Sequence, residues 1–419
     1  MNFTNVRGIL IPDGNVKRLS SNGNVLWKKS AVPDGYTEVE ALIAFGGQWI
    51  DTGITLTSED EIKIDLTISD LSEPTFLIMG SRGAYQDRNI TFSKQSSGYG
   101  IVCDFNNGNG NNYRFGTDQY TTGRFQMFNN KNSRGVVGLG QNTNVCTDSF
   151  TCPGTCCVGF WGAGTSATSL GVIGGIYSAE ITGKWKGVPC YRDSDGELGM
   201  YDLVHNQFHP NAGIGSFSAI YKDFTPGYTQ LRAIIATGQQ WFDLGFKGNQ
   251  NIRIDLNLRP TALQEPDAQI WAGSYDGLVN YYIGPGGRSN FHIYWSPNVS
   301  NSYIEFTQQT YPLVKSCQAG PTKAANTFYV FPNSKSFTKS TFETSLNIWM
   351  FNRSSVNGQY SNLPARCTCY SGRFWNNTTV IRNLVPAMRN NDNEPGLLDM
   401  KNNFFYQSMT GTPFNYVTW

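Results

Sequence analysis

The chain contains one long sequence pattern twice, and this duplication constrains its fold more than any other feature. Residues 35–53 read GYTEVEALIAFGGQWIDTG, and residues 227–245 read GYTQLRAIIATGQQWFDLG. The two segments share 11 of 19 positions without a gap, where chance gives roughly one or two. A shift of 192 residues therefore relates two copies.

The two copies also end alike. Residues 188–208, VPCYRDSDGELGMYDLVHNQF, match residues 385–405, VPAMRNNDNEPGLLDMKNNFF, at a shift of 197. Inside the copies, EIKIDL at 61–66 corresponds to NIRIDL at 251–256. Because beginning and end recur at nearly the same spacing, each copy is expected to be a complete domain of about 190 residues rather than a short solenoid repeat.

These matches divide the chain into an arm at 1–33, a first domain at 34–222 and a second domain at 225–419. The segment KDFTP between the two copies leaves room only for a short linker. The arm alternates apolar and polar residues and contains Asp13-Gly14 and Asn22-Gly23, dipeptides favoured in hairpin turns. It is too short to bury a core alone, so we expect it to pack on a partner or on the first domain.

The composition favours an all-β fold with many short strands. Charged residues make up 15% and aromatic residues 14% of the chain, which also holds 45 Gly and 18 Pro. Turn formers together with flat, stiff side chains suit strands separated by tight turns. Stretches such as NFHIYW and NTFYVF alternate as strands, and no segment shows helical periodicity. Each copy therefore predicts two packed antiparallel sheets, a jelly-roll β-sandwich.

Charge and hydropathy exclude several classes of protein. Thirty-two Lys and Arg against 31 Asp and Glu give a net charge of +1, without the basic excess that binding to nucleic acid requires. No stretch approaches the length of an apolar membrane span. The start of the chain, MNFTNVRGILIPDGN, lacks the apolar core of a signal peptide. We expect the chain to be made in a cytoplasm and not to insert into a membrane.

The opening and closing motifs carry a resemblance to a known class of domain. The pattern GYT-x-[VL], then G-x-Q-[WY]-[IF]-D-x-G, then YS-x-x-[IF], VP-x-x-R and G-[LM]-x-D, resembles laminin-G or concanavalin-A-like domains in virion proteins of tailed bacteriophages and prophages. It covers 35–213 and 227–412, and the second copy departs from it at LLDMKNNFFYQSMTGTPF. The end of the arm, GNVLWKK, also resembles amino-terminal attachment segments of such proteins.

The resemblance implies a jelly-roll protein of a phage tail, baseplate or head fibre that binds host-surface glycan. The arm would hold it to other virion proteins, and a homo-oligomer would supply many weak sites. The alternative is a capsid or tail decoration or connector protein without a ligand. An enzyme is a third possibility, because concanavalin-like glycosidases place two carboxylates on one sheet face. No strand here carries the Glu-x-Asp-x-x-Glu spacing of such a pair, so we expect binding without catalysis.

Two aromatic segments are candidate sugar sites. FNNGNGNNYRFGTDQY at 105–120 places many amides beside Tyr113 and Tyr120, and amides can bond sugar hydroxyls in a shallow site. In the second copy, Trp295 and Tyr303 belong to a similar aromatic segment. We predict carbohydrate binding by these four residues, with an ordinary exposed loop as the alternative.

A Gln-Trp-x-Asp motif recurs in both copies and has two interpretations. The shared aromatic ring could be a sugar platform, or it could be a core residue beside a turn-capping Asp. Strand alternation favours the second interpretation. The residues concerned are Gln48, Trp49 and Asp51 in the first copy and Gln240, Trp241 and Asp243 in the second.

Two short motifs resemble metal sites only weakly. Asp193, Asp195 and Glu197 alternate as in a calcium loop, but the run stops before further ligands appear, which favours a hairpin turn. His205 and His209 have the spacing of a zinc pair on a helix, but Pro210 follows directly. We therefore expect no metal and no cofactor.

The cysteines are nine in number, too few for a disulfide scaffold of this length. Four of them cluster in VCTDSFTCPGTCC, at Cys146, Cys152, Cys156 and Cys157. A zinc site, a local disulfide and reduced thiols are all compatible with this spacing. The absence of paired CxxC turns favours reduced thiols.

Overall fold

The structure is a computed structural model of the whole chain. It describes residues 7–10, 16–21, 24–28, 30–68, 76–82, 88–94, 101–106, 112–115, 123–138, 140–143, 145–147, 149–161, 174–213, 215–260, 269–276, 280–285, 290–296, 303–307, 315–319, 327–330, 333–336, 341–352, 354–355 and 364–419. These residues form strands, turns and bends, and they contain no helix that could span a membrane.

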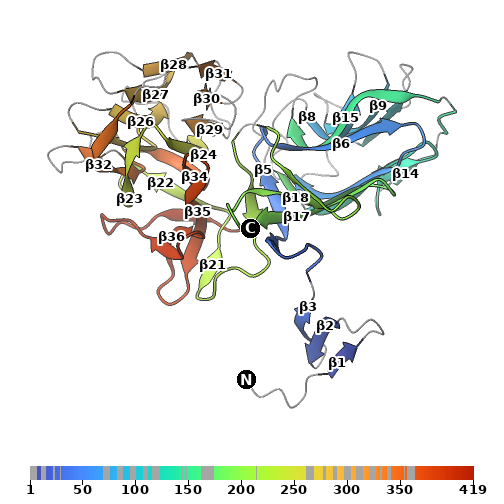
Figure 1. The fold of residues 1–419 in the computed structure, drawn as a ribbon, viewed down its shortest axis with the longest axis horizontal. Coiled ribbons are helices and arrows are strands. Elements are labelled where there is room, and N and C mark those ends of the chain that lie inside the picture. The colour runs from blue at the N-terminus through green and yellow to red at the C-terminus, as the bar shows by residue number, and fades with distance from the viewer. Residues whose placement is uncertain are drawn as a thin grey trace.

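The arm forms a small antiparallel sheet of three strands, β1 (Arg7–Leu10), β2 (Val16–Ser21) and β3 (Asn24–Lys28) (Figure 1). β2 lies in the middle and pairs with both neighbours. Within the described part of the chain, these strands pair with one another and with no strand of either copy. The alternating sequence of the arm thus produces a separate hairpin-type sheet, as expected.

The first copy folds as two antiparallel sheets. The smaller sheet has the order β11-β10-β9-β8-β15-β6, and the larger follows β14-β13-β12-β7-β16-β17-β18-β19 with β4, β5 and β20 attached. The smaller sheet contains β6 (Trp49–Thr57), β8 (Phe76–Arg82), β9 (Asn89–Lys94), β10 (Ile101–Asn106), β11 (Asn112–Phe115) and β15 (Thr151–Trp161). The larger contains β4 (Tyr36–Glu38), β5 (Ala41–Ala44), β7 (Ile62–Ile68), β12 (Arg124–Asn129), β13 (Arg134–Val136), β14 (Gly140–Asn142), β16 (Gly174–Ile181), β17 (Trp185–Arg192), β18 (Leu198–Asp202), β19 (Gln207–Pro210) and β20 (Ser218–Ile220).

The second copy repeats this topology strand for strand. Its smaller sheet has the order β28-β27-β26-β25-β32-β23, and its larger sheet follows β31-β30-β29-β24-β34-β35-β36-β37. The smaller contains β23 (Phe242–Asn249), β25 (Ala272–Tyr275), β26 (Asn280–Pro285), β27 (Asn290–Ser296), β28 (Tyr303–Thr307), β32 (Glu343–Met350) and an additional β33 (Ser354–Ser355). The larger contains β21 (Tyr228–Gln230), β22 (Ala233–Thr237), β24 (Ile252–Pro260), β29 (Lys315–Ala319), β30 (Thr327–Val330), β31 (Asn333–Ser336), β34 (Arg366–Asn376), β35 (Thr379–Arg389), β36 (Glu394–Asp399), β37 (Phe404–Tyr406) and β38 (Asn415–Val417).

The duplicated motifs occupy equivalent places in the two sandwiches. The Gly-Tyr-Thr strand β4 pairs with β17, and its counterpart β21 pairs with β35. Both pairings join the opening motif of a copy to its closing motif. The all-β prediction of two tandem sandwiches after a β arm is confirmed.

Each sandwich encloses its own apolar core, because alternate residues of each strand point inward. In β7, Ile62, Ile64 and Leu66 are buried in the first core, whereas Lys63 between them is exposed. The counterpart strand β24 contributes Ile252 and Ile254 among others to the second core. The intervening residues of β7 face outward and build the surface described below.

A smaller apolar cluster joins the two sandwiches. It contains Ala41, Ile43 and Phe45 from the first sandwich and Ala233 and Tyr370 from the second. The rings of Phe45 and Tyr370 lie 5.6 Å apart between centroids. The sandwiches therefore meet through buried side chains in addition to the short linker.

Candidate functional site

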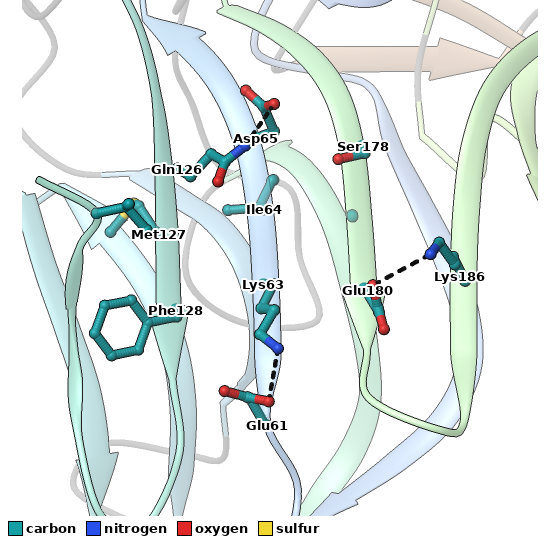
Figure 2. A pocket seen from close by; sticks show the side chains of 12 residues that line it. Glu61, Lys63, Ile64, Asp65, Gln126, Met127, Phe128, Ser178, Glu180 and Lys186 are labelled. Atoms are coloured by element: carbon teal, nitrogen blue, oxygen red, sulfur yellow. Dashed lines mark hydrogen bonds and ion pairs between the residues drawn. The ribbon is translucent and has the colours of Figure 1, made fainter.

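The outer face of the larger sheet in the first sandwich carries an open depression of about 400 Å³ (Figure 2). Strands β7, β12, β16 and β17 supply its side chains, together with the turn before β7 and the residue after β13. The residues of the outer sheet face that line it are Glu61, Lys63, Asp65, Gln126, Phe128, Val137, Ser178, Glu180 and Lys186.

One cross-strand row sets the centre of the depression. The register places Lys63 between Phe128 of β12 and Glu180 of β16. Lys186 of β17 lies opposite Glu180 in turn. Directly paired residues of neighbouring strands point to the same face, so these four side chains form a row across the sheet. Figure 2 shows these four labelled side chains on neighbouring strands.

The charges of this row are paired. The Lys63 ammonium lies 2.8 Å from the Glu61 carboxylate, and Lys186 lies 3.8 Å from Glu180. The two lysine side chains remain about half exposed, at 47% and 56%. Burial raises the pKa of Glu61, but hydrogen bonds from Lys63, Asn130 and Thr182 outweigh it, so its pKa lies below the usual value.

A second row borders the depression at the buried carboxylate of Asp65. Arg124 donates from Nε and Nη2 to the two Asp65 oxygens at 2.8 and 2.9 Å, and Gln126 donates to one of them at 3.1 Å. The Arg124 guanidinium also lies 3.8 Å above the ring of Tyr177. The hydrogen bond to Asp65 raises the pKa of Arg124. At this end of the face, the Asp65 carboxylate is thus bound by neighbouring side chains of the same sheet.

The same face of the second sandwich is covered by the first sandwich. The duplicated motifs place Asp255 where the first copy has Asp65. Asp255 accepts a hydrogen bond of 2.8 Å from the Ser216 hydroxyl, and Asn257 donates to the Ser216 carbonyl at 3.1 Å. Asn383, the counterpart of Lys186, donates to the Tyr221 hydroxyl at 3.3 Å. In the second sandwich, this sheet face thus binds the hydroxyl groups of Ser216 and Tyr221.

Burial at that covered face shifts two charged groups. Burial raises the pKa of Asp255, although Arg253 and the Ser216 hydroxyl partly offset the effect. Burial lowers the pKa of Arg373, the counterpart of Glu180. Arg253 donates to Asp255 at 3.2 Å and lies 3.5 Å from the ring centre of Trp375. Lys63 is about half exposed in the first copy, whereas its counterpart Arg253 is buried in the second.

The residues that the sequence predicted for carbohydrate binding lie elsewhere. Tyr113 is in β11 and Tyr303 is in β28, which are counterpart edge strands of the two smaller sheets. Trp295 lies in β27, paired with Tyr281. Tyr120 lies outside the described residues, as do the side chains of the other three. Carbohydrate binding by these residues stays a prediction.

The depression on the larger sheet was missed by the sequence analysis. The charges in EIKIDL signalled an exposed strand face, since Glu61, Lys63 and Asp65 alternate with buried residues. The partners of this strand on β12 and β16 could not be read from the sequence, because 61 and 115 residues separate Gln126 and Glu180 from Asp65.

The recurring Gln and Asp cap turns, as strand alternation suggested. Gln48 is buried and accepts the backbone N–H of Phe45 at 2.7 Å. Asp51 accepts the N–H of Gly53 at 2.9 Å, and Asp243 accepts that of Gly245 at 2.7 Å. Both glycines have positive φ, near 71° and 74°, a conformation that only glycine adopts without strain.

The two recurring tryptophans differ in burial. Trp241 is buried and stacks on Trp349 with ring centroids 4.0 Å apart. Trp49 is half-buried, and its ring lies against Gly213 so closely that a Cβ there would clash. The core interpretation is therefore right for Trp241 and right in part for Trp49.

The carboxylates of RDSDGELG form a hairpin turn, as predicted. Arg192 binds Asp195 at 2.5 and 3.0 Å and Glu197 at 2.8 Å. Asp193 instead accepts a hydrogen bond from the Thr37 hydroxyl at 2.8 Å. The acidic side chains therefore have separate partners and do not converge on one point.

The two histidines bind different groups. His205 contacts the buried Asp202 carboxylate at 2.6 Å through Nδ1, and His209 contacts the Asp51 carbonyl at 2.9 Å. Among the described residues, no group of three or more His, Cys, Asp or Glu side chains could hold a metal ion.

The cysteine cluster consists of free thiols. Cys146, Cys152 and Cys156 are buried, and Cys157 is half-buried. Burial raises the pKa of Cys152 to about 11 and that of Cys157 to about 12. The structure thus agrees with the interpretation as reduced cysteines. The raised pKa values of Cys152, Cys156 and Cys157 make these three thiols poor nucleophiles.

Both halves of the chain are thus antiparallel β-sandwiches of two sheets, and the first carries an open polar face. No family model matches the sequence, and no curated protein matches it. Among solved structures, the chain is similar to mouse laminin alpha1 chain, domains LG4-5, with 13% identity and a TM-score of 0.30. The match covers 84% of this chain and 92% of the laminin chain.

Proposed function

We propose that the chain is a lectin-like attachment protein that binds saccharide on the open face of its first sandwich. One observation carries this proposal. In the second sandwich, the equivalent face holds the hydroxyl groups of Ser216 and Tyr221 through Asp255 and Asn383. A sheet face that binds hydroxyl groups within the chain is suited to bind them on a sugar when it is open to solvent.

The composition of the open face supports the proposal. Lys63, Gln126 and Glu180 offer donors and acceptors for sugar hydroxyls beside the half-buried ring of Phe128. An aromatic ring beside polar groups matches a pyranose, which has an apolar C–H face and polar edges. Such shallow sites bind weakly, because hydroxyl groups exchange bonds with water for bonds with protein at little net gain.

The biological setting of this binding is also part of the proposal. The resemblance of the motifs to phage domains supports a virion protein of a tail, baseplate or head fibre, held to other virion proteins by its arm. Several copies in a homo-oligomer would raise the avidity for a host surface by about 10²-fold to 10⁴-fold. The chain then acts by binding and catalyses no reaction.

A ligand-free connector protein is the second candidate. The observation in its favour is that the equivalent face of the second sandwich docks protein, namely Ser216 and Tyr221 of the first. On this alternative, the open face would receive another protein chain in the particle.

A glycan array and a host-cell adsorption assay with the purified full chain distinguish the two. Saccharide binding that weakens at least about tenfold in Phe128→Ala supports the attachment function. The variants Tyr113→Ala and Trp295→Ala test the loop prediction in the same array. Absence of binding to any glycan and to host envelopes would overturn the proposal in favour of the connector, and release of reducing sugar would reveal an enzyme.

A further inference from the structure

We infer that the open face selects uncharged saccharides, and that the ion pairs of its central row set this selectivity. The inference rests on the proposed saccharide binding and names the chemical class of the ligand. Three features of the depression carry it. They are the lack of excess basic charge, the apolar flank formed by Phe128 and Val137, and the exposed row of Lys63, Glu180 and Lys186.

The charges around the depression leave no excess of basic groups, since Arg124 is shared between Asp65 and Glu40. Three carboxylates, those of Glu61, Asp65 and Glu180, are each paired with one cation, namely Lys63, Arg124 and Lys186 respectively. Proteins that recognise sulfated or carboxylated ligands present an excess of basic groups to the solvent. No such excess occurs among the described residues that line this face.

A charged ligand would have to disrupt these pairs. A sugar carboxylate that approached Lys63 would also approach Glu61, whose oxygen lies 2.8 Å from that ammonium. Repulsion between like charges then opposes the attraction to the lysine. A neutral hydroxyl can instead accept from the lysine and donate to the carboxylate, which leaves the ion pair in place.

The apolar flank supplies a contact that needs no charge. Phe128 lies opposite Lys63 in the register, and Val137, 58% exposed, lines the same side of the depression. The C–H face of a neutral pyranose can cover these side chains while its hydroxyls point to Lys63 and Glu180. Burial of apolar surface contributes about 25 cal/mol per Å², a contribution that salt does not screen.

The test compares matched ligands on the purified full chain. Neutral gluco-, galacto- and manno-oligosaccharides are assayed beside the same scaffolds that carry a sialic or uronic acid, at low and at high salt. We expect binding to a neutral ligand, at least about tenfold weaker binding to its acidic partner, and less than about a twofold change with salt.

Two variants of the face sharpen the test. Phe128→Ala should weaken neutral binding at least about tenfold. Glu180→Gln replaces a charged acceptor for sugar hydroxyls, so binding of the neutral ligand should weaken. The same change removes the ion-pair partner of Lys186, so binding of the acidic ligand should become stronger in a salt-dependent manner. Glu343→Gln removes an exposed carboxylate from the other sandwich and should change neither ligand. Lys186→Gln checks the same ion pair from its other side and should not improve acidic binding.

The outcomes separate this inference from the proposed function. Preference for acidic ligands with steep salt dependence would overturn the neutral selectivity and leave saccharide binding standing. Neutral binding that neither Phe128→Ala nor Glu180→Gln affects would place the site elsewhere and overturn this inference. Absence of binding to every saccharide would overturn both.

Discussion

At the scale of single residues, buried polar side chains stabilise the turns between strands by hydrogen bonds to the backbone. Gln48 and its counterpart Gln240 are buried, at 0% and 1% exposure, and both bind backbone groups of the turn that precedes them. Gln240 also donates to the Pro413 carbonyl at 2.9 Å, which ties the turn to the end of the sandwich. Asp202 and Asp399 close the later turn in the same way, since each accepts several backbone N–H groups.

The substitution Gln48→Ala tests the role of the buried amide. It leaves the buried N–H of Phe45 without its acceptor, so the free energy of unfolding should fall by about 1 to 3 kcal/mol. Urea unfolding followed by intrinsic fluorescence measures the loss. Gln207→Ala, at an exposed position, is the control and should change the midpoint little. Equal stability of the two variants would contradict the assigned role.

The carboxyl of Asp202 predicts a dependence of stability on pH. Burial raises its pKa, but hydrogen bonds from the N–H groups of Lys186 and Val204 and from His205 outweigh burial, so its pKa in the folded chain lies below the usual value. A lowered pKa means that the ionised form stabilises the fold. This contribution is complete at neutral pH and is lost as the pH falls below about 4 toward the pKa of the folded state.

Unfolding of the wild type and of Asp202→Asn in urea at pH 7 and at pH 3 measures this contribution. The difference in free energy of unfolding between the two proteins should be smaller at pH 3. Protonation of Asp202 removes from the wild type the same ionised carboxylate that the substitution has already removed. Asp223→Asn, at an exposed position, controls for the loss of one charge. A gap that stays constant between the two pH values would argue against the role of Asp202.

At the scale of elements, the outer face of the larger sheet is used differently in the two sandwiches. In the second, residues 216–221 lie on β24 and β35 through Ser216 and Tyr221. In the first, Arg124 satisfies Asp65 within the sheet, and the neighbouring row stays open. One pattern of strands thus produces a docking surface in one copy and an exposed depression in the other.

The contact between the sandwiches depends on Tyr370, which packs against Phe45 across the junction. Tyr370→Ala should weaken this junction by about 2 to 4 kcal/mol and leave each sandwich folded. Trypsin should then cut after Lys222 in the linker at least about tenfold faster than in the wild type. Tyr416→Ala, which removes a ring that is 46% exposed, is the matched control. Unchanged cleavage of the Tyr370 variant would show that the polar contacts alone hold the junction.

At the scale of the whole molecule, the arm and the sandwiches are separate units of structure. The three strands of the arm pair with one another, whereas Val32 at the end of the arm packs on Cys190 and Tyr201 of the first sandwich. Because the arm has few apolar residues to offset the entropy of ordering its chain, we predict that a partner stabilises its sheet. Figure 1 shows the three strands of the arm as a group apart from the sandwiches, and attachment through the arm stays a proposal.

Deletion of residues 1–28 tests the arm as an attachment element. The truncated chain should keep the unfolding midpoint of the full chain, since Val32 and both cores remain. It should fail to enter virus particles, measured by its amount in purified particles relative to the full chain. Normal incorporation of the folded, truncated chain would show that another surface makes the attachment.

The amino-acid sequence by itself determined the duplication, the all-β class and the turns. These features depend on neighbouring residues, such as Asp51 with Gly53 or Arg192 with Asp195, and local spacing is visible in a sequence. The tertiary structure alone decided which sheet face is open. That outcome depends on partners far apart in the chain, such as Asp65 with Arg124 and Ser216 with Asp255. Two faces built from counterpart strands differ in exposure because only one of them meets the segment that leaves the preceding sandwich.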